Sequence, residues 1–149
     1  MASSPPPANE QIDASRSILA SLLGARGDLE FAVLIGSRAT GSSHANSDWD
    51  IALQWSPQIS WEEKLGRTET LRHDLAAALQ VAPDAVDLID MWRANLAMRA
   101  SVAEEGKLLA VRNTLSWGHF LKRVWRDLED YYWDKQTGSS MTTGTSTCI

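Results

Sequence analysis

The sequence predicts an α/β (α+β) domain in which a small mixed β-sheet is backed by helices and followed by a C-terminal helix. The chain has 149 residues, which is the size of one domain with a substantial core. Short apolar segments bounded by Gly or Pro alternate along it with longer segments of helical periodicity. This alternation is typical of a sheet with helices packed on it.

The composition of the chain narrows the class of protein. Hydrophobic residues make up 44% and charged residues 22%, and no apolar segment has the length of a membrane span. The 19 acidic and 14 basic residues give a net charge of -5, which argues against strong nucleic-acid binding. Cys148 is the single cysteine, so an internal disulfide is excluded. The first residues do not resemble a secretory signal, and we expect a cytoplasmic protein with no membrane partner.

The two ends of the chain differ from the rest in composition. Residues 1–9 and 136–149 are rich in Pro, Ser, Thr and Gly and hold too few apolar residues to pack. We therefore expect disordered tails there. The folded domain is expected to span residues 10–135, with the C-terminal helix at 114–135 as its last part.

Four segments are predicted to be helical. Apolar residues recur at helical spacing over 12–23, and a capping-box sequence at Ser60 precedes a second periodic segment that ends at Leu79. The third helix is expected at 95–105 and the longest one at 114–135. The apolar stripe of that last helix is expected to consist of Trp117, Phe120, Leu121, Val124, Trp125, Leu128, Tyr131 and Tyr132.

Four shorter segments are predicted to be strands. They lie at 31–35, 48–55, 85–90 and 107–111, the last as a short edge strand. Side chains alternate between the two faces of a strand. In the second strand this places Trp49, Ile51 and Leu53 on one face and Asp48, Asp50 and Ala52 on the other.

Asp48 and Asp50 are separated by one residue at the start of the second strand. Two carboxylates on the same face repel each other unless a cation lies between them. Mg²⁺ suits such a pair, because it takes one or two carboxylates and fills its octahedron with water and substrate phosphates. The pair therefore predicts a metal and nucleotide site.

A Gly-Ser turn precedes the aspartates by ten residues. Gly36 allows close approach of a phosphate to the backbone, and Ser37 adds a hydroxyl where the turn leads into a helix. Arg38 is either a triphosphate contact or a solvated turn residue. Ser47 either caps a turn or holds Asp48 in a metal-binding rotamer. We predict nucleotide binding at these four residues of the turn and loop.

A third carboxylate is expected on a neighbouring strand, because in-line displacement needs a group that orients or deprotonates the attacking hydroxyl. The segment 85–90 offers Asp87 and Asp90. Alternation places Asp87 opposite Val86 and Leu88, which would face the core. Asp87 is therefore favoured, and Asp90 is the alternative.

Together these motifs resemble the signature of the polymerase-β-like nucleotidyltransferases. In particular they resemble the minimal nucleotidyltransferase (MNT) antitoxins that are paired with HEPN ribonuclease toxins. The sequence departs from that pattern at Thr40, where many relatives carry a basic residue, and at Trp49, where a small aliphatic residue is usual. The resemblance covers roughly residues 29–111 and rests on Gly36-Ser37-Arg38-Ala39, Gly41, Ser47-Asp48-Trp49-Asp50-Ile51 and Val86-Asp87-Leu88.

The resemblance implies a site for two Mg²⁺ ions held by Asp48, Asp50 and Asp87, and transfer of AMP from ATP with release of pyrophosphate. In the toxin-paired branch the acceptor is a tyrosine hydroxyl of the HEPN toxin, whose ribonuclease is silenced, and the two proteins would form a hetero-oligomer. Two other functions stay open. One is the same transfer to a small molecule such as an aminoglycoside, and the other is neutralisation of the toxin by contact alone.

Overall fold

The computed structural model describes residues 8–43 and 47–136. The expected tails at 1–9 and 136–149 lie almost entirely outside the described residues. Helix α1 (Ala8–Gly24) begins before the expected start of the domain, and α5 (Thr114–Gln136) ends one residue after its expected end. Such shifts are common, because the terminal turns of a helix lack part of their hydrogen bonds.

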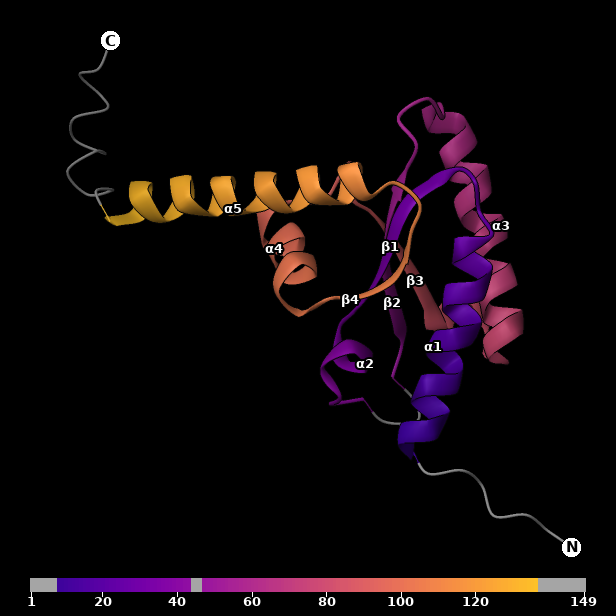
Figure 1. Ribbon diagram of the computed structural model, residues 1–149. Helices are drawn as coiled ribbons and strands as arrows, with labels where there is room; N and C mark the ends of the chain where they lie inside the picture. Colours follow the sequence, from indigo (N-terminus) through magenta and orange to yellow (C-terminus); the bar gives the residue numbers. More distant parts are fainter. Residues whose placement is uncertain (1–7, 44–46, 137–149) are drawn as a thin grey trace, which may run out of the picture.

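One mixed sheet is formed by four strands, namely β1 (Leu29–Ile35), β2 (Trp49–Trp55), β3 (Val86–Asp90) and β4 (Lys107–Val111). Their order in the sheet is β3-β2-β1-β4 (Figure 1). Strand β1 pairs antiparallel with both β2 and β4, whereas β2 pairs parallel with β3. The mixed sheet and the edge position of the strand at 107–111 confirm the sequence-based prediction.

Helices cover both faces of this sheet (Figure 1). On one face, α1 and α3 (Trp61–Leu79) pack on the apolar side chains that include Trp49, Ile51 and Leu53, as alternation predicts. On the other face, α4 (Leu96–Glu105) and α5 pack on a second core that contains Ala52. The short helix α2 (Ser37–Thr40) follows β1, and a 3-10 turn at Pro83–Ala85 leads into β3. Asp50 therefore lies on the face that α4 and α5 cover.

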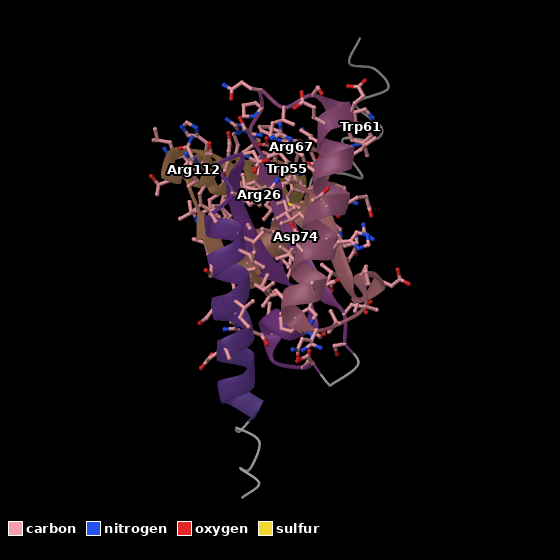
Figure 2. All side chains as sticks on the ribbon, turned by 90° about the vertical axis from the view of Figure 1, so that its right-hand side faces the viewer. Arg26, Trp55, Trp61, Arg67, Asp74 and Arg112 are labelled. Atoms are coloured by element: carbon pink, nitrogen blue, oxygen red, sulfur yellow. The ribbon has the colours of Figure 1, made fainter. Side chains whose placement is uncertain are left out.

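The predicted capping box is present at the start of α3. The Ser60 hydroxyl accepts a hydrogen bond from the Glu63 N–H at 3.2 Å, which satisfies a donor that the helix leaves open. Farther along, Arg67 donates to Asp28 at 2.8 Å, and Arg26 donates to the same carboxylate. Figure 2 shows Arg26 and Arg67 at the same end of the molecule. These bonds tie α3 to the residue that precedes β1.

The apolar stripe of α5 is only partly buried. Phe120, Val124 and Leu128 are buried, and Trp117 packs edge-on against Phe31 with 4.8 Å between ring centroids. The aromatic residues toward the end of the stripe are exposed, because α5 projects beyond the sheet (Figure 1). A helix that leaves the core has no surface on which to bury the side chains of its last turns. The exposed members of the stripe are Trp125, Tyr131 and Tyr132.

Candidate active site

Three of the predicted site residues, Asp48, Asp50 and Asp87, lie together where β2 and β3 begin. Asp50 and Asp87 are direct partners in the parallel register of these strands, so their side chains stand next to each other on the same face. Asp48 precedes β2 by one residue and is exposed, whereas Asp50 is half-buried. The three carboxylates thus line one end of the sheet, with Asp50 in the middle.

The electrostatics of Asp50 reflect this arrangement. Burial raises the pKa of the Asp50 carboxyl above its ordinary value, and the negative charges of Asp87 and Asp48 raise that pKa further. Each neighbour therefore lies close enough to disfavour the charged form. A carboxylate held between two others is a site where a cation would be stabilised.

Asp90, the alternative third carboxylate, lies apart from this cluster. Its register partner on β2 is Leu53, whose side chain belongs to the opposite face of the sheet. An Asp90 carboxylate oxygen accepts a hydrogen bond from the Trp92 N–H at 3.0 Å. Its arrangement is that of a local turn cap.

Gly36 lies directly against the middle carboxylate. Its φ of 74° belongs to the left-handed region that favours glycine, and a Cβ built on it would lie 2.5 Å from an Asp50 carboxylate oxygen. A side chain at position 36 would force the Asp50 carboxylate to move. The adjacent Ser37 is the first residue of α2, so the Gly-Ser turn and the aspartates form one continuous site.

Arg38 connects the Gly-Ser turn to the loop that carries Asp48. Its guanidinium donates two hydrogen bonds to the Ser47 carbonyl, at 3.0 and 2.7 Å, and lies over the Trp49 ring with 4.0 Å between Cζ and the ring centroid. Burial lowers the pKa of Arg38 from its ordinary value, and the charge of Asp48 opposes that shift. Arg38 therefore holds the backbone carbonyl before Asp48 and contacts the side chain that follows Asp48.

Trp49 and Arg16 are residues that the sequence-based reasoning did not assign to the site. Trp49 is 5% exposed and provides the platform under Arg38, besides filling the core as expected. Arg16 of α1 donates a long hydrogen bond of 3.4 Å to the Arg38 carbonyl. In the sequence, the only signal for the contact between Trp49 and Arg38 was the unusual presence of an aromatic residue between the two aspartates.

The donor set fits a hard divalent cation, although its members do not converge on one point. Within residues 8–43 and 47–136, no three Asp, Glu, His or Cys side chains are grouped so that they could hold a metal ion. Asp50 and Asp87 are direct neighbours, however, and Mg²⁺ commonly takes only one or two carboxylates together with phosphate oxygens. The residues therefore suit a metal that arrives with its nucleotide.

Comparison with known proteins decides the family. The family model described as polymerase beta, nucleotidyltransferase, matches residues 18–115, well over half of the chain. The chain belongs to the polymerase beta nucleotidyltransferase family. This assigns the class of enzyme as nucleotidyltransferase and confirms the family resemblance read from the motifs.

Members of the family with related sequences and folds are known. The protein adenylyltransferase MntA of Aphanizomenon flos-aquae (strain 2012/KM1/D3) is 29% identical over 105 residues, which span 64% of this chain and 66% of that relative. A crystal structure of a toxin-antitoxin with AMP-PNP matches 88% of this chain and 98% of its own, with a TM-score of 0.61 and 22% identity. A second match is the structure described as tri-AMPylated Shewanella oneidensis HEPN toxin in complex with MNT antitoxin. The match covers 90% of this chain and 98% of the matched chain, with a TM-score of 0.58 and 18% identity. These structural matches confirm the fold of a polymerase beta nucleotidyltransferase.

No helix within residues 8–43 and 47–136 is long and apolar enough to cross a membrane.

Proposed function

We propose that this chain transfers AMP from ATP to a tyrosine hydroxyl of a HEPN ribonuclease toxin and acts as its antitoxin. Membership of the nucleotidyltransferase family supports the reaction class. The sequence likeness to a protein adenylyltransferase named MntA supports a protein acceptor, and the proposal extends to this chain what that name says of the relative. A hetero-oligomer with the toxin follows from it.

The observation that carries the proposal is the register of β2 and β3. It pairs Asp50 with Asp87, while Asp48 and the backbone of Gly36 lie beside Asp50. This end of the sheet thus combines two features. Its carboxylates are neighbours, and the glycine turn beside them brings bare backbone close to Asp50. Metal-dependent nucleotidyl transfer needs both features, because the nucleotide brings cation and phosphates together.

In this proposal each residue has a distinct role. Asp48, Asp50 and Asp87 would together hold two Mg²⁺ ions. Bound Mg²⁺ would neutralise the charge of the phosphates. Gly36 and Ser37 would bind the triphosphate from the turn. Arg38 would assist the nucleotide site through its hold on the Ser47 carbonyl, and the Ser47 side chain would support Asp48. The nucleotide-binding residues are thus Gly36, Ser37, Arg38 and Ser47.

Asp87 would serve the acceptor. The tyrosine oxygen attacks the α-phosphorus of ATP, a new phosphorus–oxygen bond forms, and the bond from the α-phosphorus to the bridging oxygen of pyrophosphate breaks. The phenolic proton passes to the Asp87 carboxylate as the attack proceeds, and pyrophosphate leaves with its electron pair. Because Asp87 belongs to an edge strand, an acceptor can approach it from outside the sheet.

Coexpression with a HEPN ribonuclease toxin from the same organism tests the proposal. We expect the intact mass of that toxin to increase by one or more AMP units, each located on tyrosine by peptide mass spectrometry. The Asp48→Asn variant should give no increase while still folding, because Asp48 is exposed and lies outside the strand. Unmodified toxin that is nevertheless neutralised would favour inhibition by contact, and label transfer to an aminoglycoside alone would favour a small-molecule acceptor.

A further inference from the structure

An open groove lies beside the edge strand β3, and Ile89 of that strand is part of its lining. It has a volume of about 520 Å³ and is formed by β3, the loop that follows it and the first turns of α4. Four of its lining residues are apolar or small, namely Ile89, Ala94, Ala97 and Met98, and the others are Arg93, Asn95 and Ser101.

The groove lies on the face of the sheet that carries Asp50 and Asp87, although neither residue lines it. Ile89 lies two residues after Asp87 on the same strand, so both side chains point to the face on which α4 packs. The register partner of Ile89 is Ala52, two residues after Asp50 on β2. A group in the groove would therefore lie along β3 from the Asp87 carboxylate.

The order of the strands says which substrate would approach from that side. The Gly-Ser turn follows β1, Asp50 belongs to β2, and Asp87 belongs to β3 at the edge. In-line displacement requires the attacking oxygen to lie opposite the leaving group. With the triphosphate tail at the turn, the attacking hydroxyl would come from the β3 side of the sheet, which is the side on which the groove lies.

The lining of the groove matches an aromatic alcohol. It has no acidic side chain, and its one charged member, Arg93, is held at the rim with its guanidinium over the Trp61 ring at 4.2 Å. A tyrosine side chain suits such a lining, because its ring can be buried against apolar residues while its hydroxyl reaches a carboxylate that accepts the proton. Met98 adds a flexible thioether, which packs well on aromatic rings.

We infer that this groove binds the acceptor tyrosine side chain, with Ile89 and Met98 against the ring and Asp87 at its hydroxyl. The inference rests on the proposed function and adds to it the residues that select an aromatic over an aliphatic hydroxyl. The nucleoside of ATP would lie elsewhere in the site.

Methyl NMR tests the inference without using activity. In protein labelled with methyl-¹³C methionine, the Met98 signal is assigned with the Met98→Leu variant, and N-acetyl-L-tyrosinamide is added together with Mg²⁺ and a non-hydrolysable ATP analogue. We expect the Met98 methyl to shift with tyrosinamide but not with N-acetyl-L-serinamide, while Met91, which is 3% exposed, stays unchanged. A Met98 shift produced by the ATP analogue alone, or no shift with tyrosinamide, would overturn the inference.

A groove-filling substitution gives the kinetic counterpart. Ala97 lines the groove but is exposed, so Ala97→Trp fills the space without disturbing the core. We expect the KM for N-acetyl-L-tyrosinamide as acceptor to rise about tenfold or more, with the Kd for ATP unchanged. Glu69→Trp, at an exposed position of α3 on the opposite face, is the matched control and should leave both constants unchanged.

The outcomes separate this inference from the proposed function. If the wild type transfers label and Ala97→Trp does so with the same acceptor KM, the inference is wrong and the proposed function stands. A weaker Kd for ATP in Ala97→Trp would place the nucleoside in the groove and also overturn the inference. If the wild type transfers no label to any acceptor, the proposed function fails, and the NMR titration alone decides whether the groove binds a phenol.

Discussion

The guanidinium of Arg38 lies 4.0 Å over the ring of Trp49 and at the same time donates two hydrogen bonds to the carbonyl of Ser47. These two residues therefore fix the chain immediately before and after Asp48. A planar guanidinium can stack and donate at once, which a lysine ammonium cannot do in the same way. The contact explains how an exposed aspartate outside the strand is held beside Asp50.

Replacing Arg38 tests this positioning role. Arg38→Ala should lower kcat for AMP transfer about 10- to 100-fold, the usual cost of losing a group that orients a metal ligand. Arg38→Lys should recover little of it, because the paired hydrogen bonds to the Ser47 carbonyl are lost. Steady-state transfer rates and the Kd for ATP check the prediction, and a weakened Kd with kcat intact would instead identify Arg38 as a direct phosphate contact.

Gly36 should tolerate no side chain, for two reasons that can be separated. Gly36→Ala adds the strain of a φ of 74° and a clash with the Asp50 carboxylate, and we expect a loss of about 1–3 kcal/mol in unfolding free energy. Gly41 is the matched control, since its φ is 83° but nothing lies within 4 Å of a Cβ built on it. Gly41→Ala should cost less. Urea denaturation measures both, and equal losses would contradict the proposed clash.

The raised pKa of Asp50 predicts how stability changes with pH. The folded state holds this proton more tightly than the unfolded state, whose carboxyl keeps a pKa near 3.8. The ionised carboxyl therefore destabilises the fold above the raised pKa, and the penalty disappears as the pH falls toward 3.8. Asp50→Asn should raise the Tm at pH 7 without Mg²⁺, and this gain should shrink in acid. A Tm difference that does not vary with pH would contradict this account.

Replacing the two candidates for the third carboxylate should have opposite effects on transfer and on stability. Asp87→Asn should abolish AMP transfer without lowering stability, because it removes one charge from a repelling group. Asp90→Asn should retain transfer but lower the unfolding free energy by about 1 kcal/mol, because the hydrogen bond from the Trp92 N–H is weakened. Transfer assays and urea denaturation on both variants check this. Loss of transfer in Asp90→Asn alone would reverse the assignment.

Local patterns in the sequence predict much of this arrangement. Alternation along β2 correctly assigns Trp49 and Asp50 to opposite faces, and the motif spacing indicates the family. The parallel pairing that brings Asp87 beside Asp50 depends on contacts between distant segments, so no local pattern contains its register. The stacking of Arg38 on Trp49 depends likewise on the path of the loop between them. The periodicity of α5 continues to Tyr132, but nothing in a periodic stripe says where the helix leaves the core.

Transfer of label from ATP tests most directly whether this chain transfers AMP. ATP labelled at the α-phosphate, or in parallel at the γ-phosphate, is incubated with Mg²⁺, a HEPN ribonuclease toxin from the same organism and either the wild type or Asp48→Asn. The account predicts a labelled toxin band from the α-label only, and only with the wild type. A band from the γ-label, or equal α-labelling by Asp48→Asn, would contradict it.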